Sequence, residues 1–196
     1  YLVEEVLNTQ SDDLRQFLLQ TSILKHLKAD LCKALTGQDN CQQILETLER
    51  DNLFVTPLDN MRRWYRYHHL FGDALQIYLQ SQFPDDITML HRRASAWYIA
   101  HEKPFDALHH ALAAKDFDLA SELLESTWYE MDATYQSATW FRWVSALPED
   151  IVRQRPILSH GYARSMMMIG HLEAAAEWLH YAEQGLAQPH GQRIGD

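Results

Sequence analysis

The sequence predicts a mainly α-helical protein, in which a winged helix of short helices and a β-hairpin precedes an α-helical, tetratricopeptide-like repeat array. Short amphipathic segments fill the first quarter of the chain, an extended, aromatic-rich stretch interrupts them at residues 53–69, and helical patterning is continuous afterwards. We therefore expect a winged-helix domain over residues 1–84. Residues 85–196 would form a helical arm and the start of a repeat region.

Three helices are predicted before the extended stretch. Ser11 is a typical N-cap for the first, and a second helix over 28–35 would end at Gly37. Asn40 with Gln43 three residues later resembles a capping box that opens the third helix. The apolar spacing assigns the buried faces of the first and third helices: Leu14, Phe17, Leu18, Thr21, Ile44, Leu45 and Leu48.

The extended stretch predicts a hairpin followed by a helix. The segments 53–58 (LFVTPL) and 64–69 (WYRYHH) are rich in strand-forming residues, and 59–63 (DNMRR) supplies the turn. Pro57 cannot donate a ladder hydrogen bond, so its strand should lie at an edge. The segment 70–83 (LFGDALQIYLQSQF) predicts the closing helix.

The two adjacent histidines at the end of the second strand are the candidate functional residues. Strict alternation along a strand predicts that only one of them is available to a ligand, because successive side chains point to opposite faces. It would group the residues as Trp64, Arg66 and His68 on one face and Tyr65, Tyr67 and His69 on the other.

Three similar helix starts indicate a repeated unit: 104–112 (PFDALHHAL), 116–124 (DFDLASELL) and 171–179 (HLEAAAEWL). The first and last of them lie about two tetratricopeptide lengths apart. Gly185 is expected to close the last helix before a loose tail over 188–196.

Composition excludes several kinds of protein. The 196-residue chain has a net charge of −10, which disfavours phosphate-backbone binding as its main role. Cys32 and Cys41 are its two cysteines, and reduced thiols in a cytoplasmic protein are the expectation. No leader or membrane-spanning run is seen. The start at Tyr1, without methionine, suggests a piece of a longer protein.

No catalytic centre is predicted, since phosphate-loop, dinucleotide-binding and nucleophile-elbow motifs are missing. The segment is therefore not expected to be an enzyme. His109 and His110 point about 100° apart on a helix, so we expect surface or satisfied core histidines and no metal site. Core packing is preferred to a ligand pocket for Met166–Met168 and for the tryptophans at 97, 128, 140, 143 and 178.

A DNA-binding role for the winged helix is a rival hypothesis. The third helix over 40–50 would be the recognition helix, yet it carries Glu46 and Glu49 against a single Arg50, which argues against it. Positive charge is concentrated in the wing instead, at Arg62, Arg63, Arg66, His68 and His69. These residues either face an anion or balance nearby acids on a solvated hairpin.

Several segments, in order, carry a resemblance to a known family. They are YLVEEVL, LRQFLLQTSIL, LCKALTG, ILETLERDNLFVTPLD, WYRYHHLFGDAL, LHRRASAWY, DALHHALAAKDFDLASELLE and RWVSALPEDIVRQRP. They resemble the MalT-like large ATP-binding regulators of the LuxR family, within the signal-transduction ATPases with numerous domains. The resemblance covers nearly the whole chain.

The resemblance implies that the chain is the middle of a longer transcription activator. A phosphate-loop module would precede it, and a helix-turn-helix that binds DNA would follow. ATP or ADP would then bind the full-length protein, a slow ATPase, and not this segment alone. Self-association and an unidentified small-molecule inducer are also implied. The alternative is a helical-repeat module that binds a protein partner and has no nucleotide role.

The resemblance also implies a role for His68. In related ATPases a methionine-histidine-aspartate motif precedes an apolar helix of the winged helix, and its histidine contacts the β-phosphate of ADP. The segment 67–70 (YHHL) occupies this place, with Tyr67 for methionine and His69 for aspartate. His68 is therefore the candidate ADP contact, and His69 is expected to be structural.

Overall fold

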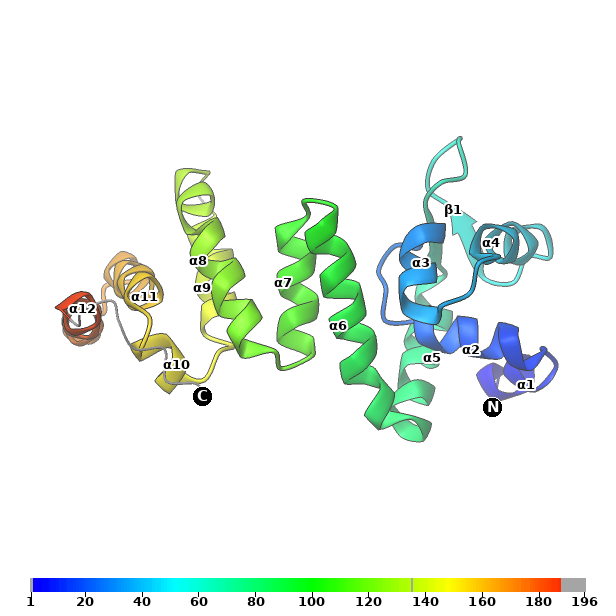
Figure 1. Ribbon diagram of the computed structural model, residues 1–196, viewed down its shortest axis with the longest axis horizontal. Helices are drawn as coiled ribbons and strands as arrows, with labels where there is room; N and C mark the ends of the chain where they lie inside the picture. Colours follow the sequence, from blue (N-terminus) through cyan, green and yellow to red (C-terminus); the bar gives the residue numbers. More distant parts are fainter. Residues whose placement is uncertain (1, 135, 188–196) are drawn as a thin grey trace. The chain divides into compact units, whose positions relative to one another are not determined.

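The computed structural model describes residues 2–134 and 136–187, so the predicted tail over 188–196 lies outside the described residues. The chain divides into two compact units, residues 1–114 (unit 1) and 115–196 (unit 2). Figure 1 shows a helical fold with one small hairpin in unit 1 and helices throughout unit 2. The predicted fold class is confirmed.

Unit 1 begins with four short helices: α1 (Leu2–Asn8), α2 (Asp12–Thr21), α3 (Ala29–Thr36) and α4 (Cys41–Arg50). Ser11 caps α2 as predicted, and its Oγ accepts a hydrogen bond from Leu14 N–H at 3.4 Å. Gly37 ends α3 in the left-handed region, with φ of 75°. The predicted capping box is wrong, because the Asn40 side chain makes no capping hydrogen bond.

The wing is a two-stranded antiparallel sheet of β1 (Val55–Pro57) and β2 (Tyr65–Tyr67). Asp59 forms its turn by accepting hydrogen bonds from the backbone N–H groups of Arg63 (3.0 Å) and Trp64 (3.2 Å). Pro57 ends β1, as its missing N–H predicts. On its other side β2 bridges to Leu27. The hairpin is confirmed, with strands shorter than predicted.

Three longer helices complete unit 1: α5 (His69–Gln82), α6 (Pro84–Ala100) and α7 (Pro104–Ala113). Helices α6 and α7 lie side by side (Figure 1), and Ser95 Oγ donates to the carbonyl of Ala107 at 2.9 Å. Arg93 Nη1 donates to the carbonyl of Leu35 at 2.6 Å and ties α6 to α3. Unit 1 therefore extends beyond residue 84, the predicted end of the winged helix.

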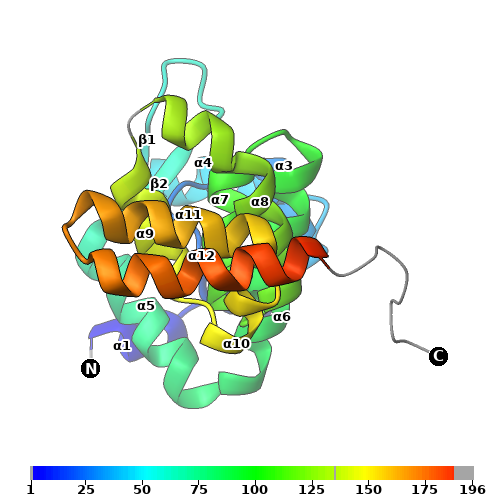
Figure 2. The same cartoon turned by 90° about the vertical axis from the view of Figure 1, so that its left-hand side faces the viewer.

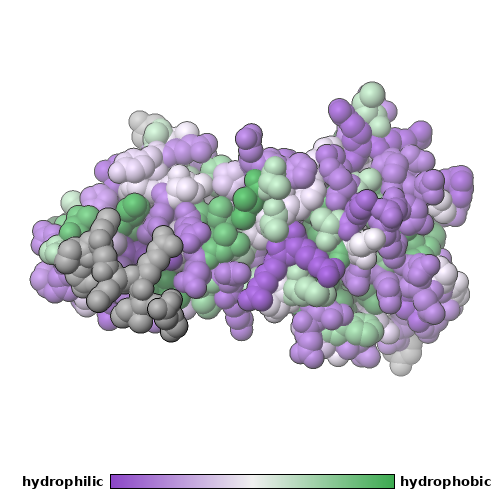
Figure 3. All heavy atoms as spheres, viewed as in Figure 1, coloured by the Kyte–Doolittle hydropathy of each residue, from purple (hydrophilic) through white to green (hydrophobic). Residues whose placement is uncertain are grey.

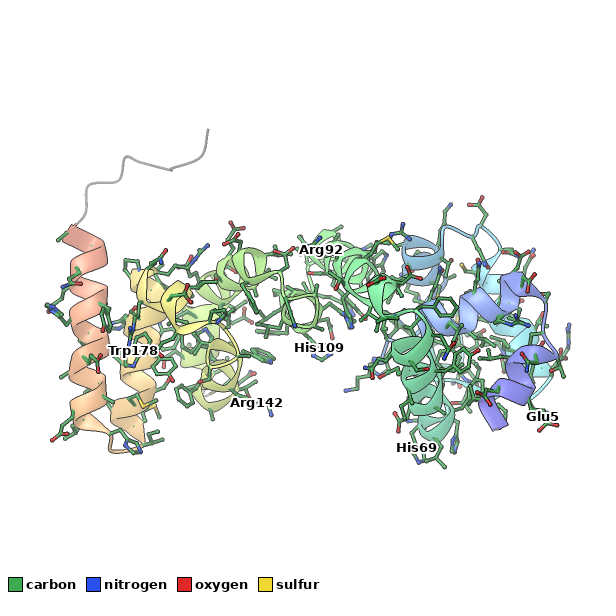
Figure 4. All side chains as sticks on the ribbon, turned by 90° about the horizontal axis from the view of Figure 1, so that it is seen from below. Glu5, His69, Arg92, His109, Arg142 and Trp178 are labelled. Carbon is green, nitrogen blue, oxygen red and sulfur yellow. The ribbon has the colours of Figure 1, made fainter. Side chains whose placement is uncertain are left out.

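Unit 2 consists of α8 (Phe117–Ala133), α9 (Ser137–Val144), α10 (Glu149–Arg153), α11 (Pro156–Met168) and α12 (Leu172–Ala187). Helices α11 and α12 form a side-by-side pair (Figure 2). Trp178 points from α12 toward α11 (Figure 4), where its ring centroid lies 4.4 Å from that of Tyr162. Aromatic packing thus joins the helices of this hairpin.

The tryptophans mainly fill the cores, as predicted. Trp140 is completely buried, and Trp97, Trp128 and Trp178 are at most 8% exposed. The prediction of core packing is wrong for two of the three methionines, since Met167 is 52% and Met168 67% exposed. These two residues lie in the last turn of α11, beyond its last buried residue, Ser165.

Candidate anion-binding cleft of the winged helix

A cleft of about 610 Å³ lies within unit 1, between the wing, the loop after α2, and helices α5, α6 and α7. Lys25, Arg66 and five imidazoles line it, whereas Asp73 is the only carboxylate among its lining residues. The imidazoles belong to His26, His68, His69, His91 and His109. Figure 4 shows His69, at the start of α5, and His109, on α7, on the same side of unit 1.

The junction between β2 and α5 explains why two histidines face the cleft. The backbone N–H of His68 donates to the carbonyl of Phe54 at 2.6 Å, and its carbonyl accepts from Phe71 and Gly72 in the first turn of α5. His68 is therefore the N-cap residue, although its side chain makes no capping hydrogen bond. The strand ends one residue earlier, at Tyr67.

This junction corrects the predicted alternation. Tyr65 and Tyr67 are buried and Arg66 is exposed, as a strand requires. Beyond Tyr67 the period changes, and both His68 and His69 are exposed and line the cleft. Their ring centroids lie 4.5 Å apart. The prediction that only one histidine is available is wrong.

Buried polar contacts hold the cleft walls in place. Leu27 and Tyr65 exchange two backbone hydrogen bonds, at 2.8 and 2.9 Å, which fix the loop after α2 against β2. Gln76 Nε2 on α5 donates to the carbonyl of Ser22 at 2.6 Å. These contacts join three segments of the chain, namely the loop after α2, strand β2 and helix α5. Each segment forms part of the wall of the cleft.

The cations of the cleft differ from most other described lysines and arginines in having no ion-pair partner. Arg62 in the wing pairs with Glu49 at 3.1 Å, and Arg155 in unit 2 pairs with Glu125 at 3.1 Å. Lys25 and Arg66 have no ion-pair partner within 2–134 and 136–187. Balancing by nearby acids therefore accounts for Arg62 and not for Arg66. The visible face of unit 1 is largely hydrophilic (Figure 3).

Burial disfavours the charged form of two of the cleft imidazoles. Burial lowers the pKa of His91 to about 4, with a further contribution from the charge of His109. Burial also lowers the pKa of His26, and the charge of Lys25 adds to this effect. Lys25 and Arg66 carry a permanent positive charge at neutral pH.

His91 also forms a pair with the buried His110 of α7, which stacks on Tyr98 at 5.4 Å between ring centroids. The two Nδ1 atoms lie 2.8 Å apart, so one ring must donate and the other accept. Burial lowers the pKa of His110 to about 3. As predicted, His110 is a satisfied core histidine, while its neighbour His109 is exposed.

Acidification is expected to destabilise unit 1 through this pair. The pKa of a histidine is about 6.5 in the unfolded chain, whereas the pKa of these two rings in the folded protein is about 4 or below. The free energy of unfolding therefore has its full value above pH 6.5, where the rings are neutral in both states. This stability is lost as the pH falls, up to about 2 kcal/mol for each ring between pH 7 and pH 5. Urea denaturation at pH 7, 6 and 5 measures it.

The variant His110→Asn, which cannot be protonated, should show a clearly weaker pH dependence than the wild type. His180→Asn, on an exposed position of α12, is the matched control and should keep the wild-type dependence. Equal pH dependence in wild type and His110→Asn would contradict the assignment.

His68 also borders a second, apolar groove of about 580 Å³ between α1 and α5. Phe54 and Phe71 stack beside it with ring centroids 4.6 Å apart. Leu70 and Ile77 of α5 line it and are 65% and 67% exposed. His68 therefore occupies the boundary between a basic and an apolar surface.

Helix α4 does not provide the surface of a recognition helix. Its exposed positions include Gln43 and Glu46, and Arg50 pairs with the neighbouring Asp51 at 3.2 Å. The described part of the chain contains no group of three or more metal-ligating side chains that could hold an ion. None of its helices is long and apolar enough to cross a membrane.

Sequence reasoning found only the wing side of the cleft. Arg66, His68 and His69 belong to one continuous segment and were identified together. Lys25, His26, His91 and His109 were missed, because the loop after α2 and helices α6 and α7 line the same cleft as the wing only in the tertiary structure. A Lys-His pair in the loop directly after α2 was the one local signal available.

Unit 1 thus combines a two-stranded wing with a basic cleft beside it and a helix, α4, that carries Glu46 and Glu49 against a single Arg50. Residues 3–87 match the MalT winged helix domain, and this segment belongs to that family. The predicted MalT-like resemblance is confirmed.

Similar curated proteins are named as transcriptional regulators. The chain is 33% identical over 159 residues to the HTH-type transcriptional regulator MalT of Vibrio campbellii, covering 81% of this chain and 18% of the relative. It is 39% identical over 124 residues to the MalT of Cronobacter sakazakii, covering 63% and 14%. The chain thus spans less than a fifth of the length of these relatives.

Proposed function

We propose that this chain is the central regulatory segment of an ATP-dependent, inducer-responsive transcription activator, in which the winged helix responds to the bound nucleotide. The basic cleft beside the wing carries this proposal. It places His68, the candidate contact to the β-phosphate of ADP, beside cations that lack acidic partners in a chain of net charge −10.

The cleft has the chemistry of a phosphate site. Imidazole N–H groups donate to phosphate oxygens, and hydrogen bonds to a charged acceptor are about twice as strong as neutral ones. A wing that contacts ADP and releases it for ATP would favour a closed, resting state. Self-association, inducer binding and DNA binding through a C-terminal domain belong to the full-length protein in this proposal.

His68→Ala in the full-length protein is expected to weaken ADP retention about ten- to hundredfold and to raise transcription without inducer. The reason is the loss of one charge-assisted hydrogen bond, worth about 1.5–3 kcal/mol. ADP that copurifies with the protein can be quantified after denaturation, and a reporter gene measures the basal transcription.

His180→Ala, which removes an exposed imidazole of α12, is the matched control and should leave both readouts unchanged. Wild-type ADP retention together with wild-type basal transcription in His68→Ala would refute the role of His68. A full-length protein that never contains nucleotide would leave the alternative of a helical-repeat module for a protein partner.

A further inference from the structure

A group of aromatic and charged side chains joins the wing to the turn between α6 and α7, outside the residues that line the cleft. Trp64, the residue before β2, is at its centre. Lys103 Nζ, from the α6–α7 turn, lies 4.9 Å from the centroid of the Trp64 ring, and Lys28 Nζ, from the residue before α3, lies 5.8 Å from it. Both ammonium groups are therefore at cation–π distance from one indole.

The contacts continue from Lys28 to the end of α6. Lys28 Nζ lies 5.6 Å from the ring centroid of Trp97 and 2.9 Å from Asp30 Oδ2. His101 stacks on Trp97 with ring centroids 3.7 Å apart, and its Nε2 lies 3.8 Å from the same Asp30 oxygen. Three segments that are far apart in the sequence thus meet in one place. We call it the cation–aromatic cluster, and its members are Lys28, Asp30, Trp64, Trp97, His101 and Lys103.

The main chain fixes the positions from which Trp64 and Lys103 meet. Trp64 N–H donates to a carboxylate oxygen of Asp59 at 3.2 Å, which anchors Trp64 in the wing turn. Lys103 N–H donates to the carbonyl of Tyr98 at 2.9 Å, which folds the turn back onto α6. The preceding residue, Glu102, has φ of 54°, a left-handed conformation that is uncommon outside glycine. The contact between the two side chains is therefore built on two ordered turns.

The cluster ties the α6–α7 hairpin to the wing itself. Arg93 of α6 donates to the carbonyl of Leu35 and so holds α6 against α3, whereas Lys103 contacts the residue at which the second wing strand begins. That strand continues through Arg66 to His68, both of which line the cleft. A movement of the wing relative to the α6–α7 turn must therefore stretch or break the contact between Trp64 and Lys103.

We propose that the cation–aromatic cluster is a conformational coupling device, through which the wing and the α6–α7 hairpin hold each other in place. Trp64 is its end on the wing, and Lys103 is its end on the hairpin. A cation–π contact at a partly exposed site changes an opening equilibrium about two- to fivefold, so the device can open and close again. The coupling does not depend on the proposed nucleotide contact, because no member of the cluster lines the cleft.

Hydrogen exchange of the 196-residue chain, followed by mass spectrometry, tests the coupling from both ends. Lys103→Gln is on the hairpin, yet we expect it to raise the exchange rates of wing amides over 55–67 about two- to fivefold. Trp64→Leu is on the wing and should raise those of the α6–α7 turn, over 101–107, by a similar factor. Coupling requires such reciprocal effects, whereas a side chain that acts only locally would change exchange in its own segment alone.

Lys115→Gln is the matched control, because it removes an exposed lysine that follows α7, at the opposite end of that helix from Lys103. Its wing amides should exchange at the wild-type rate. Trp64→Phe keeps an aromatic face and should affect the α6–α7 turn less than Trp64→Leu does. Equal effects of Lys103→Gln and Lys115→Gln on the wing would reflect net charge alone and would overturn the proposal.

A variant that combines Trp64→Leu with Lys103→Gln distinguishes coupling from two independent losses. If the two residues act through their mutual contact, adding Lys103→Gln to Trp64→Leu should leave the exchange rates of the wing unchanged. A wing rate that rises by the product of the two single effects would show that the residues act separately and would refute the coupling. Wild-type wing exchange in Lys103→Gln would refute it as well.

Discussion

Replacing Trp140 by alanine is expected to lower the free energy of unfolding of unit 2 by about 3–5 kcal/mol. The side chain is completely buried, its Nε1 donates to the carbonyl of Leu124 at 3.1 Å, and its ring centroid lies 4.5 Å from that of Trp128. Truncation would remove a large apolar surface, open a cavity and leave a buried carbonyl of α8 without this donor.

The surrounding helices cannot collapse easily into that cavity. Helix α11 already approaches the indole at Gly161, where an added Cβ would lie only 2.5 Å from Trp140 Cη2. Close packing of this kind makes the loss larger, because backbone and not only side chains would have to move. Trp140 is therefore the central packing residue of unit 2.

Urea denaturation followed by hydrogen exchange of peptides from residues 115–187 measures this effect within unit 2. Tyr129→Ala is the matched control, because Tyr129 is on the same unit and is 78% exposed. It should change stability by no more than about 0.5 kcal/mol. Similar losses in the two variants would show that burial does not distinguish these aromatic residues.

Local sequence signals predicted the elements of the fold well. Ser11 and Gly37 marked helix ends correctly, because a hydroxyl acceptor and a left-handed φ are local requirements. Asn40 failed as a capping box although the helix starts next to it, since capping depends on a side-chain rotamer that spacing does not determine. Tertiary contacts, such as that between α6 and α3, had no sequence signature.

The candidate site was predictable only where its residues are consecutive. The aromatic and basic composition of the wing segment identified it as a candidate functional site, and the family resemblance assigned a role to His68. The change of period at Tyr67 was missed, because strand alternation was extended across a strand-to-helix junction. The cleft itself is lined by the wing, the loop after α2 and helices α5, α6 and α7, an arrangement that no local sequence pattern indicates.

Tyr65→Ala is expected to lower the free energy of unfolding of unit 1 by about 3–5 kcal/mol. Tyr65 is completely buried at the centre of β2, between β1 and the bridge to Leu27. Removing its ring loosens the seam that joins the two walls of the cleft. Urea denaturation of the chain measures this effect.

Tyr65→Phe keeps the ring and is the matched control, which should stay within about 1 kcal/mol of the wild type. Its hydroxyl is buried without a hydrogen-bond partner among the described residues, so removing it leaves no partner group unsatisfied. Losses of similar size in Tyr65→Ala and Tyr65→Phe would contradict the assignment of the buried ring as the residue that stabilises the wing.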